Sequence, residues 1–198
     1  SWLDNTKALE RDPNNWDHEA FTKKSVLWPY CGGSIGIWHC PADMTMAYNT
    51  REKKYVSRIR SVSMNNWVGG PGWGNSGPQW KVYTKESDLN LPGPSNTWVL
   101  VDEREDSIND GYFVVDMAGF VEGNPTSTRQ VVDFPASYHN GAAGFAFADG
   151  HSEIHRWRSS QFLQPVKKGQ TLPLNVPARD NLARNDVYWM AERSTRAQ

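Results

Sequence analysis

The tripeptide Tyr138-His139-Asn140 carries side chains suited to proton transfer and stands before an apolar stretch. Histidine titrates near neutral pH, so His139 could take a proton from a substrate as a general base. Tyr138 or Tyr112 could supply the proton for a leaving oxygen. A structural histidine that fixes its own loop by a backbone hydrogen bond would stand in the same place, and the sequence leaves both interpretations open.

Two arginines at alternate positions, Arg58 and Arg60, would share one face of a strand. Guanidinium groups in that arrangement can bind a carboxylate through paired hydrogen bonds. β-Elimination of a uronate polysaccharide needs a base, an acid and a neutralised carboxylate, so these residues with His139 predict a polysaccharide lyase. The arginines could instead pair with the acidic run 102–106, whose carboxylates would also suit glycoside hydrolysis.

Aromatic residues give a second reason to expect a sugar ligand. The chain holds 10 Trp, and a loop rich in Gly and Pro is bracketed by Trp67, Trp73 and Trp80. Flat amphipathic rings on loops are typical of binding surfaces, and sugar rings stack on them. We therefore expect these three residues, with Asn140, to bind substrate, although the same rings could fill a small core.

Oxygen-bearing side chains at close spacing indicate a candidate calcium site. Asp106, Asn109 and Asp110 could bind the ion from one loop, although their spacing is not that of an EF-hand. The alternative is an exposed acidic turn. A second candidate for a divalent metal is a row at alternate strand positions, which could equally be a solvated face: Asp149, His151, Glu153 and His155.

Two cysteines, Cys31 and Cys40, flank a Gly-rich segment. This spacing favours a short disulfide loop formed in an oxidising compartment. A metal site or free thiols are the alternatives. Two cysteines cannot complete a four-ligand zinc site by themselves, but His39 could add a third ligand.

Length and charge narrow the class of protein. The 198 residues suffice for one domain with its own core. Charged residues make up 22% and the net charge is −1, which argues against a disordered chain and against nucleic acid as a partner. The mean hydropathy is −0.69 and the sequence has no run of 18 apolar residues, so we predict no membrane span in this chain.

Periodicity and turn residues predict the elements that must hold these side chains. Strands are expected over three segments: 55–68, 97–101 and 112–115. Asp149-Gly150 is a strong hairpin signal, with arms at 143–148 and 151–157. Helices are expected over 18–26 and 185–193. We expect a single domain made of a helical stub, a loop-rich sheet region and an extended tail, over 1–30, 31–157 and 158–198.

His139, nine intervening residues and Asp149-Gly150 form the pattern H-x9-D-G. With this pattern the chain resembles prepilin-like, type II secretion pseudopilin-type proteins of planctomycete, verrucomicrobial and lentisphaeral genomes. Further segments are similar as well: 39–43, 60–65, 102–113 and 186–189.

The resemblance implies an α+β, pilin-like fold, in which an N-terminal helix packs on a small antiparallel sheet with long loops and a wrapping C-terminal extension. It also implies an N-terminal anchor helix that is missing from this chain, and a periplasmic or cell-surface location for the anchored protein. Pseudopilins often carry a structural calcium, which adds weight to the candidate at 106–110.

Two functions follow as alternatives. The first is engagement of an acidic polysaccharide, with cleavage by β-elimination. The second is a non-enzymatic minor pseudopilin or glycan-binding subunit of a secretion or pilus-type assembly, whose partners would be other pseudopilins bound through the missing helix. Folds host unrelated functions, so the resemblance does not decide between the two.

Overall fold

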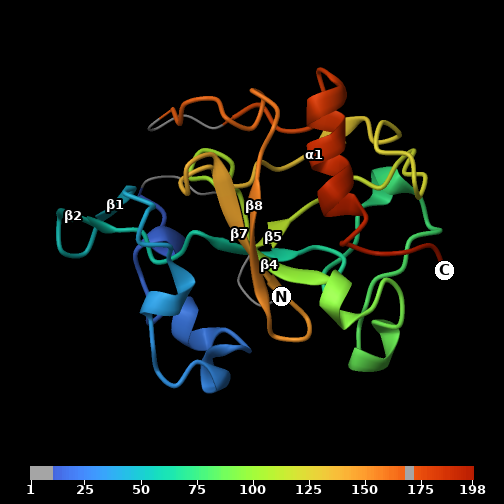
Figure 1. Cartoon of the computed structure of the whole chain (residues 1–198). Helices are drawn as coiled ribbons and strands as arrows, with labels where there is room; N and C mark the ends of the chain where they lie inside the picture. Colours follow the sequence, from blue (N-terminus) through green and yellow to red (C-terminus); the bar gives the residue numbers. More distant parts are fainter. Residues whose placement is uncertain (1–10, 168–171) are drawn as a thin grey trace.

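The structure, a computed structural model, describes residues 11–167 and 172–198. Its centre is a five-stranded sheet with the strand order β5-β3-β4-β7-β8 (Figure 1). β3 and β5 pair in parallel, and the other neighbours are antiparallel. The strand bounds are Val62–Asn65 (β3), Trp98–Asp102 (β4), Tyr112–Phe113 (β5), Ala142–Phe147 (β7) and Ser152–Arg156 (β8).

Two small antiparallel sheets and one α-helix, α1 (Asn181–Ala191), complete the described part of the fold. The small sheets pair β1 (Met46–Asn49) with β2 (Lys54–Ser57), and β6 (Gln130–Val131) with β9 (Val176–Pro177). Short 3-10 turns η1 to η4 precede β1, and η5 to η7 lie between β3 and β4: Pro13–Asn15, Thr22–Lys24, Trp28–Tyr30, Gly36–Trp38, Gly74–Ser76, Glu86–Asp88 and Pro94–Asn96.

The hairpin of β7 and β8 forms where the sequence predicts it. Gly150 has φ +93°, a conformation that glycine adopts without steric cost, and it closes the turn after Asp149. Phe145 and Phe147 point from β7 into the core, and alternate residues of the strand are less buried. Period-2 alternation in a strand with one face on the core explains this pattern.

The main core lies between the sheet and α1. Trp98 of β4 is completely buried, and its indole N–H donates to the carbonyl of Met190 at 3.1 Å. Phe145 contacts both Trp98 and Trp189 edge to face, with ring centroids 5.7 and 4.9 Å apart. The helix begins at the N-cap Asp180, whose carboxylate accepts the N–H of Ala183. Buried aromatic side chains of this kind dominate core energetics. These contacts hold β4 and β7 against α1.

The expected N-terminal helix packed on the sheet is wrong. In the described residues the α-helix is at the C-terminal end, and the fold is mostly β with a mixed sheet. Between Pro13 and Pro29 the chain forms the 3-10 turns η1, η2 and η3. Asp17 accepts the N–H of Ala20 in a local turn, and such side-chain hydrogen bonds compete with those of a helix. Residues 1–10 of the predicted stub lie outside the described residues.

The predicted strand 55–68 is divided between β2 and β3, which belong to different sheets.

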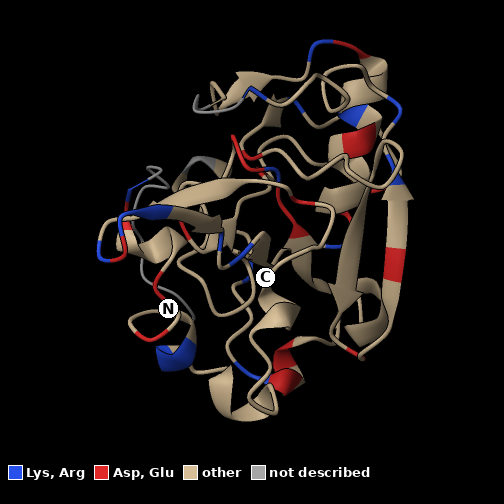
Figure 2. Cartoon of the chain, turned by 90° about the vertical axis from the view of Figure 1, so that its left-hand side faces the viewer, with Lys and Arg blue, Asp and Glu red and all other residues tan. Residues whose placement is uncertain are grey.

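Among the described residues, none of the helices has the length and apolar character that a membrane-spanning helix requires. Basic and acidic positions are interspersed along the chain (Figure 2).

Candidate metal centre

The register of the central sheet brings two candidate residues together. Asp102 is the last residue of β4, and β7 runs antiparallel to β4, so the start of β7 faces the end of β4. Asp102 Oδ2 accepts the N–H of Gly144 at 3.4 Å. His139 stands three residues before β7, in a turn that its N–H closes on the carbonyl of Ala142. Its imidazole therefore lies at the same edge as the Asp102 carboxylate.

Cys40 reaches this edge through Ser61. The N–H of Cys40 donates to Ser61 Oγ at 2.7 Å, and the N–H of Ser61 donates to the carbonyl of Trp38. Ser61 directly precedes β3, and its carbonyl accepts the N–H of Glu103, the residue after β4. The cysteine loop is thus attached where β3 and β4 meet.

Three ligand atoms converge at this point. Cys40 Sγ lies 3.4 Å from His139 Nε2, and the same nitrogen lies 3.3 Å from Asp102 Oδ2. All three atoms lie within 4.8 Å of one another. One imidazole nitrogen carries either one proton or one lone pair, so it can make a full hydrogen bond to only one of these two neighbours.

The geometry differs from that of a nucleophilic Cys–His–Asp triad. In a triad, one ring nitrogen contacts the nucleophile and the other contacts the carboxylate. Here Cys40 and Asp102 both approach Nε2 of His139. A cation at the centre of the three atoms would satisfy all of them at once.

Two of the three separations, both at His139 Nε2, match those of a metal centre. In a tetrahedral zinc site with sulfur, nitrogen and oxygen donors, neighbouring ligand atoms are about 3.3 to 3.6 Å apart, close to the two distances at His139. The backbone N–H groups of Ala42 and Asp43 donate to Cys40 Sγ and favour its thiolate form. Hydrogen bonds to a ligand sulfur are a frequent supporting interaction in metal sites.

Burial makes the anionic ligands costly without a cation. Desolvation raises the pKa of Cys40, and the neighbouring Asp102 carboxylate raises it further. Desolvation also raises the pKa of Asp102, against the effect of its hydrogen bonds with Gly144 and His139. The site opens on one side, because 35% of the His139 side chain is exposed compared with 14% for Asp102.

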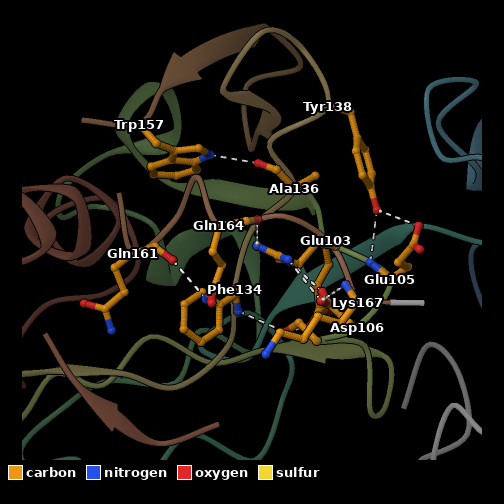
Figure 3. Close-up of polar contacts among 12 residues, drawn as sticks. Glu103, Glu105, Asp106, Phe134, Ala136, Tyr138, Trp157, Gln161, Gln164 and Lys167 are labelled. Carbon is orange, nitrogen blue, oxygen red and sulfur yellow. Dashed lines mark hydrogen bonds and ion pairs between the residues drawn. The ribbon is translucent and has the colours of Figure 1, made fainter. Parts of the chain in front are cut away.

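Tyr138, the residue before His139, points to a different carboxylate (Figure 3). Its hydroxyl accepts the N–H of Glu105 at 3.0 Å and lies 3.4 Å from Glu105 Oε2. Desolvation, followed by the charge of Asp43, raises the pKa of Glu105 to about 7. Desolvation also raises the pKa of Tyr138. The two residues form a half-buried acid pair beside the His139 turn.

The predicted arginine clamp is not at the surface. Arg58 and Arg60 are each 8% exposed. Arg58 donates to the carbonyl of Glu105, and Arg60 donates to the carbonyl of Asp110 and to Ser63 Oγ. The structure therefore places these guanidinium groups beside the acidic segment 102–110, where they bind its backbone carbonyls, and the ion pairs among the described residues include neither arginine.

The predicted sugar-binding aromatics are mainly core residues. Trp67 is 2% exposed and donates to the carbonyl of Val115. Trp73 and Trp80 are partly buried and pack against the main core. Tyr112 belongs to a second core cluster, in which it packs with Trp38.

Of the other predicted contact residues, Asn140 is exposed beside His139, in a left-handed conformation with φ +53°. Of the predicted substrate-binding residues Trp67, Trp73, Trp80 and Asn140, only Asn140 directly follows one of the candidate metal ligands in the chain.

The residues of the candidate calcium site make contacts with protein groups. Both carboxylate oxygens of Asp106 contact the Arg104 guanidinium, at 2.6 and 3.0 Å, and one also accepts the N–H of Lys167. Asp110 accepts the N–H of Tyr112 at 2.7 Å, and Asn109 is half-buried. Asp106 therefore serves a buried ion pair.

The expected disulfide is absent, because both Cys31 and Cys40 are free. The thiol of Cys31 donates to the carbonyl of Leu27 at 3.1 Å, whereas Cys40 faces His139. His39, the expected third ligand, lies 3.5 Å from Asp43 Oδ2 instead. Successive side chains of an extended segment point in opposite directions, so His39 and Cys40 do not share a ligand position.

The histidines of the second candidate metal site, the row of alternate residues from Asp149 to His155, lie in two different environments. His151 contacts Asp149 at 2.5 Å through Nδ1 and Glu153 at 3.4 Å through Nε2, so both of its nitrogens face carboxylates at the surface. His155 stacks on Trp189 instead, with ring centroids 3.8 Å apart.

Sequence reasoning selected His139 but missed its partners. The sequence predicts Asp102 as a hydrolytic carboxylate or a partner of the arginines, and Cys40 as a partner of Cys31 or His39. The available signal was that each is a ligand-type residue in one of the segments that carry the family resemblance.

No family model, no curated protein and no solved structure matches this chain.

Proposed function

We propose that the chain is a metal-binding domain, in which Cys40, Asp102 and His139 bind one divalent transition metal with a coordination position open to solvent. The observation that carries this proposal is the convergence of Sγ and Oδ2 on the single nitrogen Nε2 of His139. Three protein ligands with an open fourth position are typical of catalytic zinc sites.

Zinc fits the donor set best. A thiolate is a soft ligand, and imidazole and carboxylate are both common zinc ligands. Calcium takes six to eight oxygen ligands, so it does not suit Cys40. A calcium ion in the 106–110 loop stays a separate prediction, for which Asn109 and Asp110 are the remaining oxygen donors.

The predicted engagement of an acidic polysaccharide, and its cleavage by β-elimination, are kept as the enzymatic part of the proposal. In this proposal His139 binds the metal through Nε2, so that nitrogen no longer serves as the general base predicted from the sequence. A bound metal would supply Lewis-acid chemistry and the positive charge that a uronate carboxylate needs. That role replaces the one predicted for Arg58 and Arg60, whose donors are used by backbone carbonyls. The non-enzymatic alternative is a pseudopilin-like, glycan-binding subunit at the cell surface or in the periplasm.

Metal binding is tested with chelator-treated protein. Zinc affinity is measured by competition with a chromophoric chelator, and cobalt serves as a spectroscopic probe because a thiolate ligand gives a charge-transfer band in the near ultraviolet. We expect one equivalent to bind, and a loss of affinity of about 100-fold or more in Cys40→Ser and His139→Gln. Cys31→Ser is the matched control and should bind as the wild type does. Equal affinity and an equal cobalt spectrum in Cys40→Ser would reject the site.

The enzymatic part needs its own measurement. Zinc-loaded protein is incubated with a panel of acidic polysaccharides, and absorbance of a 4,5-unsaturated uronate is followed with and without chelator. A rise that chelator and His139→Gln abolish would support the lyase. A flat trace on every polymer would leave the non-enzymatic alternative.

A further inference from the structure

A second site lies beside α1, away from the metal ligands. A pocket of about 620 Å³ is formed by the loop 119–129, the end of β9 and the first turns of α1. The loop runs beside the helix (Figure 1). This volume is within the range of small-molecule sites. Among the lining residues, those that argue for a ligand are Asn124, Thr126, Ser127, Arg129, Pro177 and Arg184.

The charge in this pocket is uncompensated. Arg129 and Arg184 both line it, and no carboxylate does. Over residues 11–167 and 172–198, the ion pairs include neither arginine. Arg184 Nε is buried without a hydrogen-bond partner. Guanidinium groups at a pocket wall that lack a carboxylate partner are stabilised by an anion, so an acceptor bound in the pocket would be favourable.

Hydrogen bonds to backbone carbonyls connect the elements that carry the two arginines. Thr128 Oγ1 donates to the carbonyl of Arg184 at 2.8 Å, and the N–H of Ala178 donates to the carbonyl of Arg129 at 2.8 Å. The first contact attaches the loop to α1, and the second attaches it to the end of β9. The backbone positions of the two arginines are therefore fixed relative to each other, which lowers the cost of bringing both to one ligand.

The remaining lining groups indicate the class of ligand. Guanidinium groups bind carboxylates in a planar, paired geometry. Asn124 and Thr126 are both exposed, and the hydroxyl of Thr126 already donates to Asn124 Oδ1, which leaves the Asn124 amide N–H groups available. Amide and hydroxyl groups beside the apolar Pro177 suit the mixed surface of a sugar.

From these observations we infer that the pocket between Arg129 and Arg184 binds the carboxylate of an acidic sugar residue. The site is separate from the metal centre and independent of the metal. It gives the predicted acidic-polysaccharide partner a surface contact that the buried Arg58 and Arg60 do not offer.

The test uses the chelator-treated protein and three probes in calorimetric titrations. The probes are a uronate trisaccharide, the same trisaccharide with its carboxyl groups reduced to alcohols, and inorganic phosphate. We expect the uronate to bind and the reduced sugar to bind at least 10-fold more weakly. Arg129→Gln and Arg184→Gln should each weaken uronate binding at least 10-fold. Arg156→Gln is the control, because Arg156 is an exposed arginine on β8 outside the pocket.

Three outcomes would overturn the inference. They are equal binding of the charged and reduced sugars, unchanged affinity in Arg184→Gln, and phosphate binding that matches or exceeds uronate binding. The last outcome would indicate a general anion site. Cys40→Ser removes a proposed zinc ligand and changes no residue of this pocket. The zinc-binding experiment and the sugar-binding experiment can therefore fail independently of each other.

Discussion

Cys40 Sγ and His139 Nε2 lie 3.4 Å apart although 99 residues separate them in the chain. The contact exists because the sheet register places the turn before β7 against the end of β4, and Ser61 attaches the cysteine loop to the same edge. A soft ligand and a partly exposed imidazole thus meet at a largely buried carboxylate, which is the arrangement that supports the proposed metal centre.

Gly144 leaves room for the Asp102 carboxylate. A Cβ at Gly144 would lie 3.1 Å from Asp102 Oδ2, and the backbone there is open to any residue. We predict that Gly144→Ala displaces the carboxylate and weakens zinc binding about 10-fold or more, with the fold retained. The control is Gly36→Ala, because a Cβ at Gly36 meets no atom within 4 Å. Chelator competition measures both variants, and wild-type affinity in Gly144→Ala would contradict the prediction.

Asp106 should matter for stability and not for calcium. Its carboxylate pairs with Arg104, and both side chains are almost fully buried. Asp106→Ala leaves the guanidinium charge buried and unpaired, so the free energy of unfolding should fall by about 3 to 5 kcal/mol. Glu52→Gln removes an exposed pair with Lys54 and should change it by less than about 1 kcal/mol. Urea unfolding compares the two, and equal small effects would show that the Arg104 pair does not stabilise the fold.

Trp67 should behave as a core residue. Because its ring is 2% exposed, Trp67→Ala should lower the free energy of unfolding by about 3 to 5 kcal/mol. Tyr30 is 86% exposed, so Tyr30→Ala should change it by less than about 0.5 kcal/mol. Denaturant titration gives both values. A stable Trp67→Ala variant with weakened sugar binding would instead support the predicted role in substrate binding.

His155 should make stability depend on pH below neutrality. Desolvation, helped by the charge of Arg193, lowers its pKa from 6.5 to about 4. The unfolded chain therefore binds this proton more readily, and stability is lost as pH falls from 6.5 to about 4. The loss should be about 1 to 2 kcal/mol, after allowance for the partial exposure of the ring.

His155→Phe keeps a ring to stack on Trp189 and removes the titration. Carboxylates with raised pKa values, such as Glu105, act in the opposite direction over part of this range. The informative quantity is therefore the stability of the variant minus that of the wild type, from urea unfolding at pH 7 and pH 4.5. A difference that does not change with pH would refute the role of His155.

Local sequence signals were sufficient for several elements. Strand β4, the β7–β8 hairpin and helix α1 lie where alternation, Asp149-Gly150 and the C-terminal pattern predict them. These features depend on residues that are neighbours in the chain. The N-terminal helix was predicted both by the family resemblance and by local signals over 18–26, and it was wrong, because the described residues from Pro13 onward form turns with local side-chain bonds.

Residue types and spacing identify the side chains that could do chemistry, and His139 is among them. Which of these side chains meet depends on the packing of distant segments. Cys40, Asp102 and His139 belong to three segments whose distances depend on strand register and on one Ser61 contact. Likewise, packing buries Arg58 and Arg60, whereas Arg129 and Arg184 line the same pocket. Register and burial are set by packing between distant segments, and no local pattern encodes them.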